Sequence, residues 1–202
     1  RLIIRYSELE KSLDYCKALA NKGYHVCIQP MVTMRYKQTE LLSLCAAANE
    51  MNAYALYIVD SYGYMEAGDV ESVARFFDQH LNEEVRIGFH AHNNLNLALA
   101  NTQSFLSLGL KRRLIVDSTI CGMGQGAGNL QTELLVGQYI RANSTRFDFG
   151  EILDACELIE AMSPIPNWGY SLTNLLPAIH KVAYKYAYAL RVQHGLALSD
   201  IH

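Results

Sequence analysis

The sequence lacks the features that mark membrane proteins, nucleic-acid binders and secreted proteins. No apolar run approaches the roughly 20 residues of a membrane span, and no signal-peptide pattern opens the chain. Its 17 basic residues are outnumbered by 20 acidic ones and are scattered, so they form no stripe that would bind phosphates. We therefore expect a cytoplasmic protein with no membrane or nucleic-acid partner.

No C-x-x-C spacing occurs among the cysteines, which are odd in number and lie mostly within apolar segments. This pattern is typical of buried reduced thiols rather than of a disulfide framework or a zinc knuckle. The five cysteines are Cys16, Cys27, Cys45, Cys121 and Cys156.

What the sequence does contain is a repeating unit of an apolar run, a turn and a helix-like stretch. Continuous apolar runs are typical of strands buried on both faces of a parallel sheet. From the second run onward, their centres recur about every 30 residues, the length of a strand plus a crossover helix. A mostly helical portion follows the last run. The predicted strands are residues 1–6, 24–30, 54–60, 85–92 and 113–120.

Polar or glycine-rich segments follow four successive strands: "PMVTMRY", "DSYGYM", "HAHNN" and "DSTICGMGQGAGN". An open doubly wound sheet would gather such segments at one switch point, whereas a barrel gathers them around a shared mouth. We therefore predict an α/β fold of the (β/α)8 TIM barrel type. Residues 1–144 would form a partial barrel of about five β/α units, and residues 145–202 a helical region continuous with it.

The segment "IGFHAHNN", residues 87–94, contains two histidines one residue apart. On a strand, His90 and His92 project from the same face, with roughly 7 Å between their Cα atoms. This spacing allows both imidazoles to reach one divalent cation. The alternative is a polar strand end that happens to contain two histidines.

Carboxylates and a glycine-rich loop stand at neighbouring strand ends. Asp60 and Asp117 each close an apolar run, where a carboxylate needs a cation or several donors, unless it caps a turn. Ser61 either donates to a substrate carboxylate or caps its loop. The glycines of residues 122–129 predict positive φ or close backbone contact but no nucleotide fingerprint. Asn129, at the loop's end, offers an amide oxygen to a metal or a helix cap.

Three segments together resemble the HMG-CoA lyase-like metal-dependent barrels, the DRE-TIM metallolyases: "YIVDSYGYM", "GFHAHNNLNLALAN" and "VDSTICGMGQGAGNLQTELL". The match runs from about residue 54 to residue 136. Within that family, "HAHNN" and "GMGQGAGN" are more similar to the 4-hydroxy-2-oxovalerate aldolases than to the acetyl-CoA-using synthases, which carry H-x-H-N-D and G-E-R-A-G-N.

The resemblance implies divalent-metal-dependent cleavage of a 4-hydroxy-2-oxo acid to pyruvate and an aldehyde. It implies metal ligation by His90 and His92, with Asn129 in or beside the coordination sphere. Ser61 would lie near the pyruvyl carboxylate and Asp60 would orient its neighbours. The metal would be Mn²⁺ or Mg²⁺, with Co²⁺ or Zn²⁺ as alternatives.

The resemblance also implies a tyrosine in the C-terminal helices near the site and a set of partners. In the aldolases a GYxxxY pattern supplies a tyrosine near the site, and only its first tyrosine, Tyr170, is matched here. The implied partners are a 2-oxo acid or pyruvate, an aldehyde, an aldehyde dehydrogenase as a docking partner, and further copies of the chain in a homo-oligomer.

The sequence departs from the family at its first strand, where these barrels carry an R-D motif and the aldolases a histidine soon after. Because the chain begins at Arg1 within a predicted strand, we expect a C-terminal portion whose N-terminal strands are missing and which is inactive alone. Its exposed sheet edges would pair with the missing segment or another copy. Two alternatives stay open: an acyl-CoA Claisen-type synthase, and a non-catalytic barrel remnant that serves as a binding or assembly module.

Overall fold

The computed structural model describes residues 1–141, 147–163 and 167–201, within which two compact units are distinguished. Unit 1 comprises residues 1–61, 65–90 and 100–117, and unit 2 comprises residues 62–64, 91–99 and the described residues from 118 onward. The predicted domain boundary between residues 144 and 145 lies outside the described residues.

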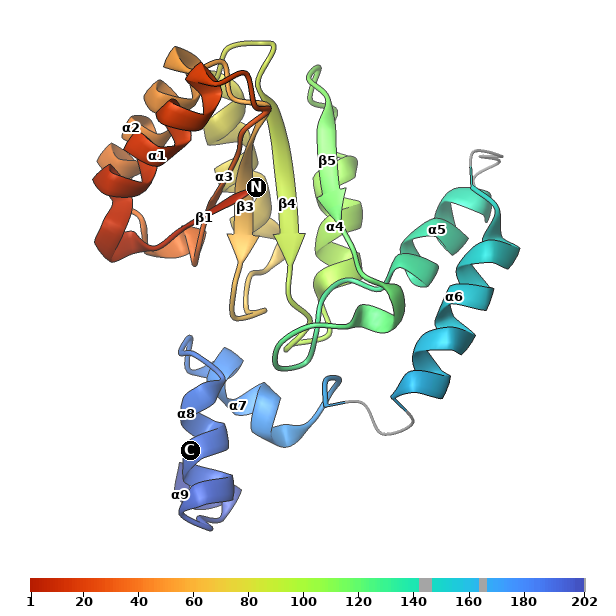
Figure 1. The fold of residues 1–202 in the computed structure, drawn as a ribbon. Helices are drawn as coiled ribbons and strands as arrows, with labels where there is room; N and C mark the ends of the chain where they lie inside the picture. The colour runs from red at the N-terminus through yellow and green to blue at the C-terminus, as the bar shows by residue number, and fades with distance from the viewer. Residues whose placement is uncertain (142–146, 164–166, 202) are drawn as a thin grey trace. The chain divides into compact units, whose positions relative to one another are not determined.

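The sheet of unit 1 contains the five predicted strands in chain order. The β1–β2, β2–β3 and β4–β5 pairs are parallel, and the arrows of β3 and β4 point the same way in Figure 1. The predicted parallel order is therefore confirmed. The strands are β1 (Leu2–Ile4), β2 (Cys27–Pro30), β3 (Ala55–Asp60), β4 (Arg86–Ala91) and β5 (Leu114–Asp117).

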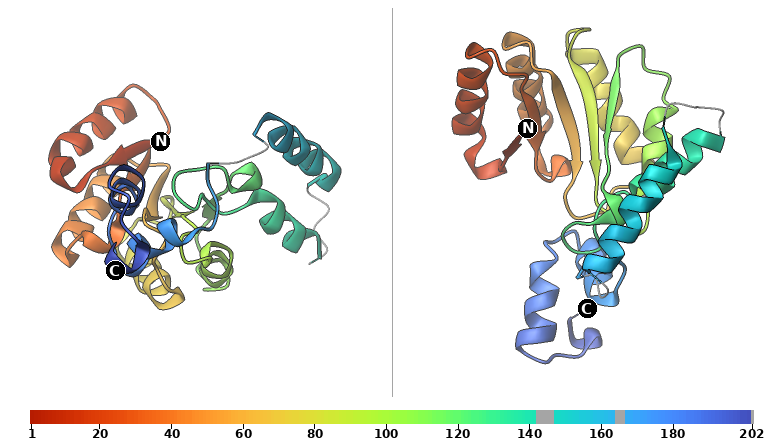
Figure 2. Two further views of the ribbon diagram at one scale, coloured as in Figure 1. Left: turned by 90° about the horizontal axis from the view of Figure 1, so that it is seen from below. Right: turned by 45° about the vertical axis from the view of Figure 1, so that its right-hand side comes forward.

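A helix separates each strand of the sheet from the next, as the repeating unit predicts. Figure 2 shows these helices following one another along one side of the strands. This arrangement gives the sheet one helix-covered face and one face directed away from the helices. The helices are α1 (Leu9–Asn21), α2 (Gln38–Glu50), α3 (Ala67–His80) and α4 (Ala98–Leu106), with short 3₁₀ turns η1 (Tyr6–Glu8) and η2 (Thr33–Arg35).

The two faces of the sheet differ in chemistry because side chains alternate along a strand. On the helix-covered face, Leu56, Ile58 and Phe89 are fully buried, and the Phe89 ring lies 5.6 Å from that of Phe105 in α4. The opposite face carries Tyr57, packed with small and branched side chains of β2 and β3. Stability therefore comes mainly from the apolar face, which leaves the other face able to hold polar groups.

Unit 2 is mostly helical, as predicted for the C-terminal portion. Helix α5 packs against α6, and α7 packs against α8. No helix among the described residues is long and apolar enough to cross a membrane. The elements are the 3₁₀ turn η3 (Ile120–Gly122), α5 (Thr132–Arg141), α6 (Phe149–Met162), α7 (Leu172–Ile179), α8 (Lys185–Tyr188), the π-helical turn η4 (Ala189–Gln193) and α9 (Leu198–Ile201).

Two glycine substitutions test the packing of unit 1. A Cβ atom on Gly88 would lie 2.5 Å from ring carbons of the buried Tyr57, so Gly88→Ala is expected to lower the free energy of unfolding by about 1–3 kcal/mol. Gly68→Ala in α3 is the control. A Cβ atom on Gly68 meets no atom within 4 Å, so this substitution is expected to raise the free energy of unfolding by up to about 1 kcal/mol. Urea denaturation measures both, and equal stability of Gly88→Ala and the parent protein would contradict this packing.

Candidate functional site

The buried carboxylate of Asp117, at the end of β5, is the centre of a polar cluster in unit 1. Its Oδ2 atom accepts hydrogen bonds from Arg1 Nη1 at 2.8 Å and from Gln29 Nε2 at 3.1 Å. Its Oδ1 atom accepts one from the Tyr57 hydroxyl at 3.2 Å. These donors come from β2, β3 and the residue before β1, so one charge gathers side chains from across the sheet.

His90 joins this cluster from the neighbouring strand. It is the register partner of Asp117 in the β4–β5 pair, and its Nδ1 atom lies 3.1 Å from Asp117 Oδ2. When Asp117 accepts the Nδ1 proton, the ring is held in one orientation and one tautomer, with Nε2 as the nitrogen that can bind a cation. Carboxylates hold metal-binding histidines in this manner in many proteins.

Tyr57 is the neutral donor of the cluster. Burial, followed by the negative charge of Asp117, raises the pKa of its hydroxyl, and the positive charge of Arg1 opposes this shift. The hydroxyl therefore keeps its proton at neutral pH and continues to donate to Asp117.

Asp60 and Ser61 hold the loops that follow the strands of unit 1. The Asp60 carboxylate is buried and accepts the backbone N–H of Met65 at 3.1 Å. The Ser61 hydroxyl oxygen accepts the backbone N–H of Val32 at 2.8 Å. Val32 has the positive φ of 52°, an uncommon conformation for a β-branched residue. These contacts are of the loop-capping kind, and they place both side chains at the carboxyl ends of strands.

In unit 2, His92 and Asn129 are partners in an isolated antiparallel bridge. Two backbone hydrogen bonds flank the pair, donated by the amides of Leu130 and Asn93. This is the non-hydrogen-bonded type of antiparallel pair, in which Cα atoms lie about 4.5 Å apart and the side chains share one face. The imidazole of His92 and the amide of Asn129 are thus neighbours.

The side-chain amide of Asn129 is only half satisfied. Its Nδ2 atom donates to the carbonyl of Met123 at 3.0 Å. Its Oδ1 atom is buried and has no hydrogen-bond partner, which costs free energy unless a cation or a donor fills the place. The sequence alternatives for Asn129 were a metal ligand and a helix cap, and this oxygen caps no helix among the described residues.

The glycine-rich loop has the positive φ values that the sequence predicts, at Gly122, Gly126 and Gly128. A Cβ atom on Gly128 would lie 2.1 Å from the carbonyl oxygen of Gly122, so the loop closes on itself there. The ring of Tyr184 packs beside Gly126. No pattern in the sequence singles out Tyr184.

The predicted site residues are therefore located in two sets. Unit 1 holds His90, Asp60 and Ser61, and unit 2 holds His92 and Asn129.

Tyr170 lies in the segment before α7 of unit 2 and has a side chain that is 58% exposed. Neither Gln29 nor Tyr57 was expected from the sequence, in which their only signal is a polar atom within an otherwise apolar run. Asp117 was expected to need a cation or donors or to cap a turn, and its contact with His90 was not expected.

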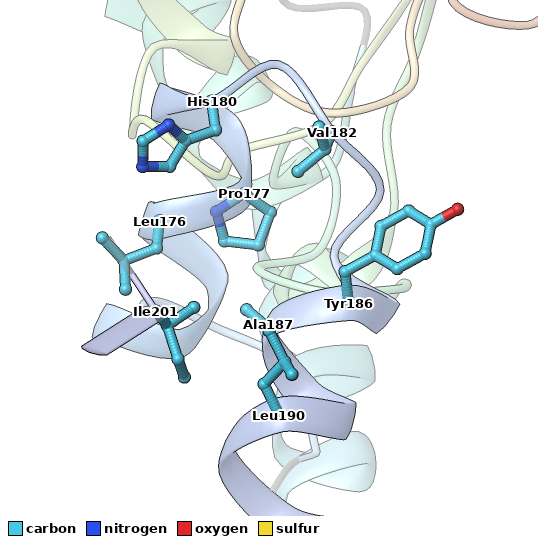
Figure 3. Close-up of a pocket in the computed structure, with 8 residues that line it drawn as sticks. All are labelled: Leu176, Pro177, His180, Val182, Tyr186, Ala187, Leu190 and Ile201. Atoms are coloured by element: carbon cyan, nitrogen blue, oxygen red, sulfur yellow. The ribbon is translucent and has the colours of Figure 1, made fainter. Parts of the chain in front are cut away.

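The C-terminal helices of unit 2 enclose a separate apolar pocket of about 160 Å³. Figure 3 shows its side chains, which come from α7, α8, η4 and α9 and the connection after α7. It contains no residue that the sequence assigned to the site. The lining residues are Leu176, Pro177, His180, Val182, Tyr186, Ala187, Leu190 and Ile201.

Comparison with curated proteins finds 4-hydroxy-2-oxovalerate aldolases. That of Pelotomaculum thermopropionicum is 38% identical over 82% of this chain and 48% of its own length. That of Pseudoalteromonas translucida is 27% identical over 100% of this chain and 59% of its own length. The chain thus spans about half the length of the curated relatives it matches.

Comparison with solved structures finds the same type of fold. The N-terminal domain of an inferred aldolase from Bacteroides vulgatus is 25% identical, with a TM-score of 0.81 over 92% of this chain and 60% of that one. The HMG-CoA lyase of Bacillus subtilis is 20% identical, with a TM-score of 0.70 over 81% of this chain and 63% of that one. The expected barrel-type α/β fold is confirmed, here with five consecutive strands.

The HMGL-like family model matches residues 5–159. This range includes four of the five strands, both histidines of "HAHNN" and the whole glycine-rich loop. The chain belongs to the HMGL-like family.

Proposed function

We propose that the protein is a divalent-metal-dependent aldolase that cleaves a 4-hydroxy-2-oxo acid to pyruvate and an aldehyde. The observation that carries the proposal is the contact between His90 and Asp117, because it orients an imidazole as a metal ligand requires. The names of the relatives support the choice of substrate class.

The chemical types of the proposed ligands suit a divalent cation. His90 and His92 would supply imidazole nitrogens, and the buried Asn129 Oδ1 atom, which has no hydrogen-bond partner, would supply an amide oxygen. Such mixed nitrogen and oxygen ligands suit Mn²⁺, Co²⁺ or Zn²⁺, and Mg²⁺ less well. When bound, the cation would act as a Lewis acid toward the 2-oxo acid and stabilise the negative charge that develops as the carbon–carbon bond breaks.

The protein's own groups then have separate tasks. Asp117 orients the His90 ring, while Gln29 and Tyr57 hold Asp117 in place. Ser61 uses its oxygen to hold the Val32 amide, so its hydroxyl proton is the group we propose for the substrate carboxylate.

The roles that the sequence suggests for Asp60, Tyr170 and the partner proteins are also proposed here. Asp60 holds the loop that follows Ser61, and Tyr170 stays the tyrosine that the family resemblance suggests near the site. An aldehyde dehydrogenase and a further copy of the chain stay proposed partners. Proton transfer from the alcohol and to the new carbon requires a base and an acid, and Tyr170 is proposed for one of these two steps.

The activity is tested on the protein as its gene encodes it, by following pyruvate release from 4-hydroxy-2-oxovalerate with Mn²⁺. His90→Ala and His92→Ala are each expected to lower kcat/KM at least about 100-fold, because each removes a ligand. His80→Ala is the matched control, since this exposed histidine contacts the carbonyl and the ring of Phe76 in its own helix. Metal-independent cleavage, or release of CoA from an acyl-CoA in place of pyruvate formation, would contradict the proposal.

A second test concerns the orientation of His90. Asp117→Asn keeps the size of the side chain but removes its charge, so we expect Mn²⁺ affinity to fall about 10- to 100-fold. Mn²⁺ binding is measured by the loss of the free-ion electron paramagnetic resonance signal. The exposed Asp154→Asn variant serves as the control for loss of one negative charge. If Asp117→Asn binds Mn²⁺ as tightly as this control, Asp117 does not position the ligand.

A further inference from the structure

Three side chains of unit 2 that the proposed aldolase chemistry does not use converge at one point. They are Cys121 of η3, Glu133 in the first turn of α5, and Cys156 of α6. The two sulfur atoms and a carboxylate oxygen all lie within 4.8 Å of one another. Glu133 and both cysteines are partly buried, and no disulfide joins the cysteines.

The backbone of Cys121 is held firmly in this cluster. Its N–H donates to Glu133 Oε2 at 3.1 Å, and its carbonyl accepts from Trp168 Nε1 at 2.9 Å. Its thiol lies 3.8 Å from the carbonyl oxygen of Cys156. Cys121 also has a φ of 53°, a conformation that non-glycine residues rarely adopt. The thiol is therefore presented to its neighbours by a backbone that is fixed at both of its polar groups.

The geometry and the ligand types fit a small thiophilic cation. Thiolates bind Zn²⁺ at about 2.3 Å, so two sulfur ligands of a tetrahedral site lie about 3.8 Å apart. The ligand atoms of the cluster need to approach one another by no more than about 1 Å to reach this spacing. A carboxylate is a usual further ligand of zinc, and water completes a site with three protein ligands.

The charges of the cluster also favour a bound cation. Burial, the hydrogen bond with Cys121 and the negative charge of Glu133 together raise the pKa of the Cys156 thiol to about 11. The Cys156 thiol is therefore neutral at neutral pH, and its thiolate form would be repelled by the negative charge of Glu133. A divalent cation relieves this repulsion and replaces the thiol protons.

We propose that Cys121, Glu133 and Cys156 bind a thiophilic divalent cation of the zinc class. The cation would join η3, α5 and α6, three elements that already pack against one another. It would therefore stabilise the fold of unit 2 around the end of the glycine-rich loop. This proposal does not depend on the aldolase activity.

The test uses Cd²⁺ as a probe, because a sulfur-to-cadmium charge-transfer band in the ultraviolet reports thiolate ligation and not imidazole ligation. We expect one equivalent of Cd²⁺ to saturate the band in the full-length protein under a reductant that contains no thiol. Cys156→Ser is expected to abolish the band at that ratio. Cys45→Ser, which changes a buried thiol of α2 outside the cluster, is expected to leave it unchanged.

Glu133→Gln separates the ligand role of the carboxylate from its structural role. A glutamine oxygen still accepts the Cys121 N–H, whereas the anionic ligand is lost. We expect the affinity for Cd²⁺ to fall at least tenfold, while circular dichroism shows a retained fold. His90→Ala combined with His92→Ala is expected to keep the band, so failure of the aldolase proposal and failure of this one are distinguishable.

Cysteine alkylation in the unsubstituted protein tests the proposal without relying on variants that could misfold. Zn²⁺ is expected to slow alkylation of Cys121 and Cys156 by iodoacetamide at least tenfold, as mapped by mass spectrometry. The proposal is overturned if the protein shows no thiolate band, if the band survives in Cys156→Ser, or if Zn²⁺ leaves the alkylation of both cysteines unchanged.

Discussion

The burial of one carboxylate, Asp117, is the constraint on which the polar face of the sheet depends. A buried negative charge is costly unless several donors compensate it, and Asp117 has contacts with Arg1, Gln29, Tyr57 and His90. Because β4 and β5 are in register at His90 and Asp117, the same contact that compensates the charge also orients the imidazole. Stability of the cluster and geometry of the proposed metal ligand are thus coupled.

The two faces of the sheet differ in chemistry, and hydrophobic burial on one face offsets the cost of burying polar groups on the other. The helix-covered face buries large apolar side chains such as Leu56 and Phe89, and it supplies most of the hydrophobic stabilisation. On the other face, Gly88 leaves room for the Tyr57 ring, which allows the tyrosine hydroxyl to reach Asp117. A small residue on one strand therefore determines whether the hydrogen-bonded cluster on its neighbours can form.

The sequence predicted the fold well because its signals are local. Apolar runs repeating about every 30 residues predicted the five strands, and the glycines of the loop predicted positive φ. The two short segments that contain His90, His92 and Asn129 were singled out for the same reason. By contrast, Gln29 and Asp117 are 88 residues apart, and Tyr57 and Asp117 are 60 apart, so only the strand register brings them together. The cluster of Cys121, Glu133 and Cys156 escaped notice similarly, since no short spacing links its members.

The divalent cation that we propose would be bound by the imidazoles of "HAHNN", with Asp117 hydrogen-bonded to His90. X-ray absorption at the manganese edge of the Mn²⁺-loaded full-length protein can identify these ligands, because imidazole rings give a characteristic multiple-scattering pattern. We expect the nearest ligands of the manganese to be two imidazole nitrogens and further oxygens, with only one imidazole remaining in His92→Ala. A shell of oxygen atoms alone, or a spectrum that His92→Ala leaves unchanged, would contradict it.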